Sequence, residues 1–207
     1  MKYLLIIVPI ISNVIVSESK RIVKTIYGNE INGIYYRIKT VKTQKNSRRM
    51  FLNGNGEILE FNIKPHITLS QDIDISEIDL PIFIAKVEKV LANQHGFTLC
   101  PLSIGDYGQD FTFYLEYSKN SQIVSLFKKI HAVSKSYISE ERYKVYSQRT
   151  FVPHTTILYD DIDPIKIKAA ETMLNKDMFD QPVKVNEVEL WALNPNYQDI
   201  IHKFPLS

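Results

Sequence analysis

Two short segments of the chain carry the same pattern, Pro-His-x-Thr. The first places His66 two residues before Thr68, and the second places His154 two residues before Thr156. The residues around each copy are apolar or β-branched, which predicts a short strand. Because positions i and i+2 of a strand point to the same face, each imidazole should stand beside its hydroxyl. The pattern therefore predicts two matched groups for proton transfer and hydrogen bonding.

Two such groups suit displacement at phosphorus. Histidine titrates near neutral pH, so one imidazole can be neutral while the other is protonated. The neutral ring would take a proton from an attacking hydroxyl, and the imidazolium would give one to the leaving oxygen. The threonine hydroxyls would donate hydrogen bonds to the non-bridging oxygens, where charge accumulates. This chemistry needs no metal or other cofactor, and we expect none.

A single histidine on a strand is more often a structural residue, so the hypothesis depends on the two copies holding equivalent places. Each half of the chain is predicted to run strand, helix, motif strand, helix, strand. The first half has strands at 2–9, 65–70 and 97–104, with helices at 12–28 and 76–96; the second has strands at 111–117, 151–158 and 183–193, with helices from 120 and at 163–174, followed by a short tail. The pattern predicts an α+β fold of two duplicated βαβ-type units whose antiparallel sheets face a central cleft.

The two halves differ in length because of a basic insertion. The distance from the first strand to the histidine is 63 residues in the first half (Tyr3 to His66) and 43 in the second (Phe111 to His154). The extra residues fall in hairpins at about 39–60, which are rich in Lys and Arg. This segment either faces an anion such as RNA or forms a solvated hairpin. We expect one domain, 1–207, with lobe-forming halves of about 1–104 and 105–207.

Composition narrows the class of protein. The 207 residues are 44% hydrophobic and 23% charged, as in ordinary globular proteins. Cys100 is the only cysteine, which excludes an intrachain disulfide and a cysteine-based zinc site. The apolar start of the chain is too short to span a membrane and is needed as the first strand of the duplicated plan. We expect a cytoplasmic monomer that does not bind membranes.

The paired motifs, the flanking order of elements, Arg149 before the second motif and the closing Phe-Pro-Leu resemble the two-histidine (2H) phosphoesterase superfamily, whose members include LigT-like and 2′,5′-phosphodiesterase-like proteins. The resemblance implies that His66 and His154 are the acid and base, in an order left open. It implies that Thr68 and Thr156 hold the phosphate. Weaker candidates for substrate binding share a cationic or aromatic side chain: Arg149, Tyr107, Tyr159, Trp191 and Tyr197. Arg149 would bind phosphate or form an exposed salt bridge, and the four aromatic residues would stack on bases, although packing is the more frequent role of each.

Three functions remain open on the sequence. The first is a metal-independent phosphodiesterase that cleaves 2′-5′ or 3′-5′ linked oligonucleotides, linear or cyclic, and so degrades a signalling nucleotide of a defence response. The second is a 2′,3′-cyclic phosphodiesterase or RNA-end ligase in RNA processing. The third is a non-catalytic RNA-binding module, for which the histidines would be dispensable for binding. All three imply a nucleotide or oligonucleotide partner.

Overall fold

The structure is a computed structural model of the chain, and it describes residues 2–27, 65–106, 112–145, 147, 149–159, 164–172, 174–193 and 198–207. The basic insertion expected at about 39–60 lies outside these residues. The strands are β1 (Lys2–Ile7), β2 (Ile67–Asp74), β3 (Phe97–Leu99), β4 (Pro101–Asp106), β5 (Thr112–Tyr117), β6 (His154–Tyr159), β7 (Val183–Val185), β8 (Glu187–Leu193) and β9 (Gln198–Pro205). The helices are α1 (Asn13–Tyr27), α2 (Leu80–Leu91), α3 (Ser121–Ser134), α4 (Glu140–Val145) and α5 (Pro164–Thr172), with short 3₁₀ turns η2 (Lys135–Tyr137) and η3 (Lys176–Asp180).

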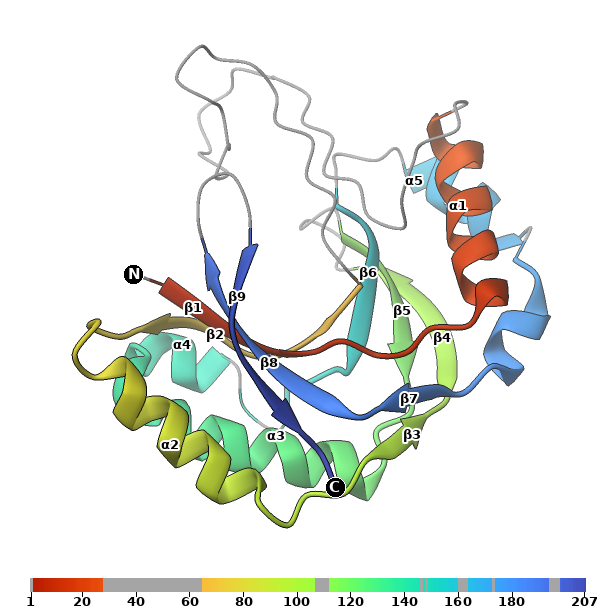
Figure 1. Cartoon of the computed structure of the whole chain (residues 1–207). Helices are drawn as coiled ribbons and strands as arrows, with labels where there is room; N and C mark the ends of the chain where they lie inside the picture. Colours follow the sequence, from red (N-terminus) through yellow and green to blue (C-terminus); the bar gives the residue numbers. More distant parts are fainter. Residues whose placement is uncertain are drawn as a thin grey trace, which may run out of the picture.

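The strands form antiparallel sheets that carry helices on their outer sides. A four-stranded sheet has the order β2-β1-β8-β9, and a three-stranded sheet has the order β4-β5-β6; β3 and β7 form a short pair between them. Figure 1 shows the two larger sheets meeting at an angle, with α2 and α3 below the first and α1 and α5 beside the second. The expected α+β fold with antiparallel sheets is confirmed.

The apolar start of the chain becomes a central strand. β1 lies between β2 and β8, and Leu5, Ile6 and Ile7 are all 0% exposed. A strand buried on both faces reads as a continuous apolar run, which explains why the start of the chain invites comparison with a membrane span. None of the helices in the described ranges is both long and apolar enough to cross a membrane.

Polar caps set the predicted helix starts. The Ser12 hydroxyl accepts a hydrogen bond from the Ile15 amide at 3.4 Å, just before α1. The Asn120 side chain accepts one from the Ile123 amide at 3.0 Å at the start of α3. Pro81 lies in the first turn of α2, where its missing N–H costs nothing. These contacts satisfy amides that a helix itself leaves unpaired.

The apolar stripes of the helices cover the outer sides of the sheets, as their periodicity predicts. The buried residues of α2 and α3 are Phe83, Val87, Leu91, Ile123, Leu126, Phe127, Ile130 and Ser134. The apolar members of this set share one core with apolar residues of both large sheets, including Leu5, Ile67, Leu115 and Ile157. The two sheets and their helices are therefore held by one continuous core.

Two predicted strands are each divided in the structure. Residues 97–104 form β3 and β4, which pair with different strands, and Pro101 opens the second of them. A proline lacks the N–H that a continuous ladder needs, so a new strand begins there. Residues 183–193 likewise form β7 and β8, which are separated by Asn186 and belong to different sheets.

Two further elements differ from the sequence prediction. The expected tail is β9, which pairs with β8 along most of its length. It is an edge strand, and one face of it has little apolar character, so its period-2 signal is weak. The stretch expected to be irregular before the second motif contains α4, whose six residues are too few for a clear helical period.

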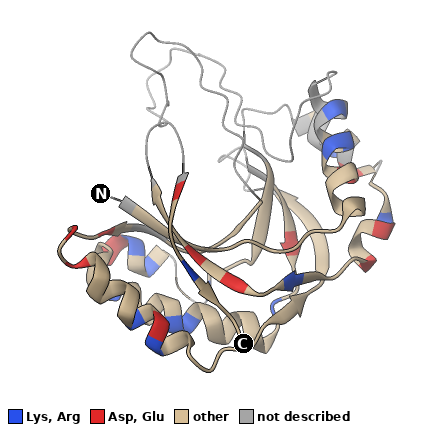
Figure 2. Ribbon diagram, viewed as in Figure 1, with Lys and Arg blue, Asp and Glu red and all other residues tan. Residues whose placement is uncertain are grey.

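The order of elements in each half follows the duplicated plan, but the sheets combine the two halves. The four-stranded sheet takes β1 and β2 from the first half and β8 and β9 from the second. The strand β4 spans the predicted division at 104 and 105 and pairs with β5. The division into a single domain with two halves remains a prediction. The charged residues of the described chain lie largely on the outer helices and on β8 and β9 (Figure 2).

Candidate active site

The first motif stands at the start of β2. His66 directly precedes this strand, and Thr68 lies within it, opposite Ile6 of β1. Between them, Ile67 is 0% exposed and points into the main core. His66 and Thr68 are partly buried, and Thr68 occupies the other face of the sheet. The alternation expected from the sequence is therefore present in β2.

The second motif lies in β6 with the same alternation. His154 is paired with Glu116 of β5, and Thr156 is paired with Tyr114. The intervening Thr155 is 2% exposed and points into the protein. His154 and Thr156 thus share the face of the three-stranded sheet that is turned away from the core.

The fold brings the two motif strands together. β2 contacts β6, although they belong to different sheets, and in Figure 1 the start of β2 lies beside β6. Helices cover the outer side of each sheet, and the motif face is the opposite one. Both motif faces are consequently turned toward the angle between the two sheets.

The surroundings of His154 fix its tautomer. Its Nδ1 lies 2.8 Å from the backbone oxygen of Val152. A carbonyl oxygen only accepts, so Nδ1 must carry the hydrogen and Nε2 is the nitrogen that gains or loses a proton. Burial lowers the pKa of His154, although the Val152 hydrogen bond and the nearby Glu116 carboxylate oppose that shift. The imidazole is therefore favoured in its neutral form.

An aromatic ring supports His154 from the neighbouring strand. The ring centroids of Tyr114 and His154 are 4.9 Å apart, and the planes are tilted by 57°. Tyr114 is 7% exposed and lies opposite Gly105 of β4. A Cβ atom at Gly105 would come within 2.6 Å of the Tyr114 ring. The glycine therefore leaves the space in which the tyrosine ring lies.

His66 also packs on an aromatic ring, but a different one. The ring centroids of His66 and Trp191 are 5.2 Å apart, with the planes tilted by 58°. Trp191, which the sequence offered as a base-stacking residue, is 2% exposed. Its indole Nε1 donates to Oε2 of Glu189 at 2.5 Å. Burial alone would raise the pKa of Glu189, but hydrogen bonds from Lys203 and Trp191 lower it.

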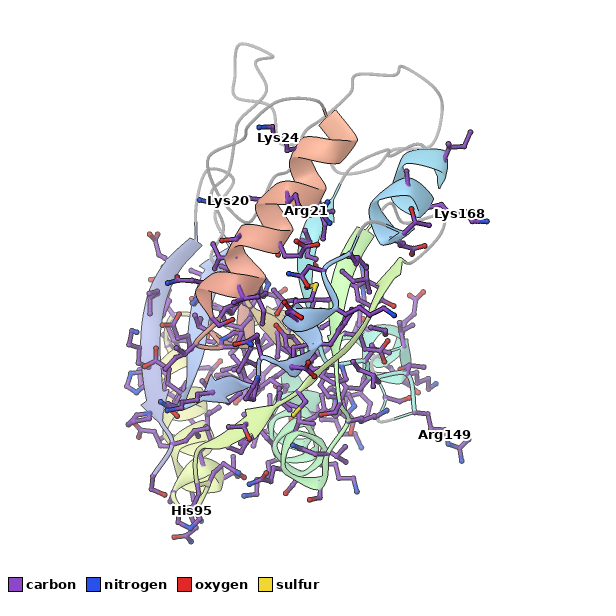
Figure 3. All side chains as sticks on the ribbon, turned by 90° about the vertical axis from the view of Figure 1, so that its right-hand side faces the viewer. Lys20, Arg21, Lys24, His95, Arg149 and Lys168 are labelled. Carbon is purple, nitrogen blue, oxygen red and sulfur yellow. The ribbon has the colours of Figure 1, made fainter. Side chains whose placement is uncertain are left out.

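The other weaker candidates are placed differently. Arg149 is exposed, and its side chain points outward from the surface (Figure 3). Tyr159 closes β6, but its side chain lies outside the described part of the chain, as do Tyr107 and Tyr197 entirely. Their roles in substrate binding remain predictions.

The remaining histidines have structural partners. His95 lies 3.1 Å from the backbone oxygen of Ser207, and His202 lies 3.1 Å from Glu88. His131 stacks between Phe127 and Tyr143, at centroid distances of 5.2 and 3.9 Å. Phe127 in turn stacks on Phe151, just before the second motif. This aromatic stack ties α3 to the segment that leads into β6.

Sequence reasoning missed Tyr114, Glu116 and Glu189. Tyr114 and Glu116 lie on β5 beside the second motif strand, and Glu189 lies on β8 two residues from Trp191. Only the pairing of strands brings them close to the motifs. Within a strand, Tyr114 and Glu116 alternate with the core residues Leu115 and Tyr117, so the period-2 pattern marks their face. Nothing in the sequence marks their partners.

The described residues contain no group of three or more His, Cys, Asp or Glu side chains placed to hold a metal ion. Cys100 is exposed and unbonded to another cysteine. The acidic stretch at 160–163 lies outside the described part of the chain.

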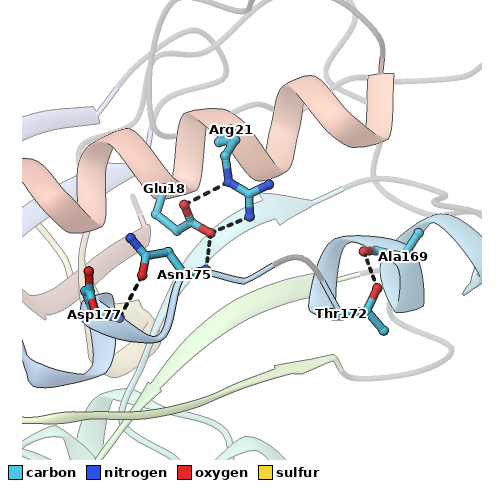
Figure 4. Close-up of polar contacts among 6 residues, drawn as sticks. All are labelled: Glu18, Arg21, Ala169, Thr172, Asn175 and Asp177. Atoms are coloured by element: carbon cyan, nitrogen blue, oxygen red, sulfur yellow. Dashed lines mark hydrogen bonds and ion pairs between the residues drawn. The ribbon is translucent and has the colours of Figure 1, made fainter.

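A separate polar cluster ties α1 to the segment after α5 (Figure 4). Arg21 donates two hydrogen bonds to Glu18, at 2.9 and 2.6 Å, and the amide of Asn175 donates a third at 2.8 Å. The Asn175 side chain also caps η3 by accepting from the Asp177 amide at 2.9 Å. The hydrogen bonds from Arg21 lower the pKa of the buried Glu18 against the opposing effect of burial.

The sequence itself identifies the family. The model of the 2′-5′ RNA ligase superfamily matches residues 48–196, which are more than half of the chain and include both motifs. The chain belongs to this superfamily. It is a superfamily of two-histidine phosphoesterases, so the resemblance seen in the sequence is confirmed and the chain is an enzyme of the phosphodiesterase class. No curated protein sequence matches the chain.

Solved structures share the fold of this superfamily member. Escherichia coli LigT complexed with 3′-AMP is 13% identical, with a TM-score of 0.57 over 100% of this chain and 98% of LigT. The protein TT0787 of Thermus thermophilus is also 13% identical, with a TM-score of 0.58 over 100% of this chain and 98% of that protein. LigT complexed with phosphate gives 12% and 0.55, over 100% and 97%. These similarities confirm the LigT-like two-histidine phosphoesterase fold.

Proposed function

We propose that the enzyme is a metal-independent phosphodiesterase that cleaves 2′-5′ or 3′-5′ linked oligonucleotides, linear or cyclic, by acid–base catalysis with His66 and His154. The observation that carries the proposal is the arrangement of the two motifs. Both motif faces are turned away from the core and toward the angle between the sheets, and their strands contact each other. A phosphate bound there would meet one imidazole and one hydroxyl from each sheet.

His154 is proposed as the general base. Its Nδ1 is engaged by the Val152 carbonyl at 2.8 Å, which directs Nε2 toward proton transfer. Burial lowers its pKa, so the ring is neutral over more of the pH range than an ordinary histidine. Nε2 takes the proton of the attacking hydroxyl while that oxygen forms its bond to phosphorus.

His66 is proposed as the general acid. Its imidazolium gives a proton to the leaving oxygen as the bond between that oxygen and phosphorus breaks. Thr68 and Thr156 donate hydrogen bonds to the non-bridging oxygens, whose negative charge grows during the displacement. After one turnover His66 has lost a proton and His154 has gained one, so exchange with water restores the starting state.

The nucleotide nature of the substrate draws on the superfamily. LigT has been crystallised with 3′-AMP, ATP and NADP⁺. Because the present enzyme shares the LigT fold, these complexes support a nucleotide substrate for it. Degradation of a signalling nucleotide in a defence response is one role that such an activity would serve. We further propose that the enzyme acts as a monomer in the cytoplasm.

Contact with a longer RNA is proposed through basic residues. The insertion at about 39–60 carries five Lys or Arg residues, all between Lys39 and Arg49, a stretch that contains no Asp or Glu. In Figure 3, Lys20 and Lys24 of α1 and Lys168 of α5 extend from neighbouring helices, and all three are exposed. Phosphate contacts by such side chains would make binding strongly dependent on salt.

A substrate panel tests the proposed function. The panel contains 2′-5′ and 3′-5′ oligoadenylates, cyclic di- and trinucleotides, and 2′,3′-cyclic mononucleotides, each assayed with and without chelator and with the product termini identified. We expect cleavage of an oligonucleotide diester and full activity in chelator. Loss of activity on chelation, restored by added metal, would overturn the acid–base assignment.

A second candidate function is 2′,3′-cyclic phosphodiesterase or RNA-end ligase activity in RNA processing. The observation that favours it is the family description itself, which is that of 2′-5′ RNA ligases. The same panel separates the cyclic phosphodiesterase from the first candidate, because only the cyclic mononucleotides would then be cleaved, and joining of RNA ends added as a further arm would show the ligase. Binding without turnover in any arm, unchanged by His66→Ala, would instead indicate an RNA-binding module.

A further inference from the structure

The imidazole of His66 rests against a buried tryptophan. Trp191, on β8, is the only tryptophan of the chain and is 2% exposed. Leu4 and Ile6 of β1 surround its ring in a small apolar cluster on the motif face of the sheet, with Val8 packed against it. A ring enclosed in this way has little surface left for a nucleobase, so its placement calls for another explanation.

A buried carboxylate holds the indole in place. Oε2 of Glu189 accepts the indole N–H at 2.5 Å, and the Glu189 residue is 1% exposed. Nζ of Lys203 on β9 lies 2.7 Å from the other oxygen of Glu189 and 2.8 Å from Glu187. Strand register aligns these side chains across the sheet, because Glu189 lies opposite both Ile6 and Lys203. The contacts run in sequence from Lys203 through Glu189 and Trp191 to His66, and Figure 2 shows the acidic positions of β8 beside the basic position of β9.

Packing alone does not require this carboxylate. Burial of the Glu189 carboxylate costs desolvation free energy that the ion pair with the half-exposed Lys203 only partly offsets, and a neutral acceptor would already satisfy the indole N–H. However, when an indole N–H donates to an ionised carboxylate, electron density shifts from the N–H group into the aromatic ring. An electron-rich ring attracts a cation placed within about 6 Å of its centroid. The protonated form of His66 is such a cation.

We propose that Trp191 is a positioning residue for His66, held by Glu189, and that the pair orients the imidazole and favours the imidazolium. The inference rests on the proposed role of His66 as general acid. The titratable groups on the described strands of the site are known from strand register. β1 carries the apolar Leu4 and Ile6 beside Trp191, β8 carries Glu187 and Glu189, and Lys203 of β9 lies opposite Glu189. On the other sheet, Glu116 lies opposite His154.

The single tryptophan gives a test that does not depend on activity. Protonated imidazole quenches indole fluorescence on contact, so the emission of the wild-type enzyme should fall as pH decreases through the titration of His66. We expect this inflection to be lost in His66→Gln and retained in His154→Gln. An inflection that survives in His66→Gln would overturn the proposal. If the wild-type emission shows no such inflection, the proposal is already overturned, so the test does not depend on how well a variant folds.

Kinetics on three variants distinguish positioning from simple stability, using the panel substrate that the wild type cleaves fastest. Glu189→Leu removes the acceptor, Glu189→Gln keeps an acceptor without charge, and Glu187→Gln is the matched control that leaves the indole bond intact. We expect Glu189→Leu to lower kcat about 10-fold with KM nearly unchanged. Glu189→Gln should keep most of kcat and move the alkaline limb of the pH–rate profile down by about 0.5 unit. Glu187→Gln should resemble the wild type.

The outcomes separate this inference from the proposed function. If His66→Gln and His154→Gln retain full turnover, the proposed function fails. If both abolish turnover while Glu189→Leu behaves like Glu187→Gln, the proposed function stands and only the role of Trp191 is overturned. Thermal unfolding of each variant shows whether a loss of kcat exceeds the loss of folded enzyme.

Discussion

The two copies of the Pro-His-x-Thr motif are alike in sequence and different in surroundings. His154 is tied to the Val152 carbonyl, packs on Tyr114, and has its pKa lowered by burial. His66 directly precedes its strand and packs on Trp191, whose indole is bonded to an ionised carboxylate. The same motif thus has different neighbours in its two copies, and for His154 they favour the neutral ring. If the proposed roles hold, a duplicated motif has become an acid and a base through its surroundings, without any change in the motif itself.

Replacing each histidine is the strongest test of this difference. We expect His66→Ala and His154→Ala each to lower kcat by about 10²–10⁴-fold on an oligonucleotide diester, as is typical for loss of a general acid or base. On a nucleoside p-nitrophenyl diester, whose leaving group needs no proton, His66→Ala should recover most of its activity. His154→Ala should stay impaired. Steady-state rates on both substrates measure this, and equal losses on both for His66→Ala would reverse or remove the assignment.

The threonines should behave alike, in contrast to the histidines. Thr68→Val and Thr156→Val each remove one hydrogen-bond donor from the proposed phosphate site while keeping the β-branched shape. We expect kcat to fall by about 10–10³-fold in each, because such donors act on charge that develops in the transition state. The pH–rate profile should keep its shape. A variant that raises KM alone would show that its hydroxyl serves ground-state binding.

Removing the aromatic support of His154 should shift its titration. Tyr114→Leu opens the His154 ring to water, and since burial holds its pKa low, the pKa should rise toward the ordinary value of 6.5. The base must be neutral, so the acidic limb of the pH–rate profile should move to higher pH by about 0.5–1 unit. The matched variant on the other sheet, Trp191→Leu, should leave that limb in place. Titration of His154 by NMR in both variants checks the assignment, and a shift in both would contradict it.

A methyl group at Gly105 should perturb the same site less directly. Its Cβ would lie 2.6 Å from the Tyr114 ring, so the ring must move toward or across His154. We expect Gly105→Ala to destabilise the fold by about 1–3 kcal/mol, as overpacking usually does. Thermal unfolding of Gly105→Ala and of the double variant with Tyr114→Leu measures the effect. If the loss persists in the double variant, contact with the ring is not its cause.

The polar cluster at Glu18 should affect stability and leave both histidines unchanged. The pKa of Glu18 in the folded protein is lowered from the ordinary 4.5. Its contribution to stability is therefore complete above pH 4.5 and is lost as the pH falls through the folded-state pKa. Glu18→Gln should cost about 1–3 kcal/mol at pH 7 and progressively less below pH 4.5. Denaturant unfolding at several pH values measures this. A change in kcat at pH 7 would show that α1 influences the site.

Local patterns carried much of the fold. The alternation in both motif strands, the caps at Ser12 and Asn120 and the apolar stripe of α3 all depend on residues close together in sequence, and all are present in the structure. The sequence predictions were wrong where the pairing of strands determines where an element begins or ends. The strand β9 exists because β8 offers it an edge, and β3 separates from β4 because each has a different partner.

The sequence by itself determined which groups are the candidates for the chemistry, two imidazoles and two hydroxyls, and the strand faces on which they stand. Tertiary structure alone decided that β2 and β6 lie in contact, and that Trp191 and Tyr114 support different histidines. Side-chain spacing along a strand is fixed by backbone geometry, which any short stretch of sequence expresses. The neighbours that tune an imidazole come from strands far away in the chain, and only the folding of the whole core sets their register.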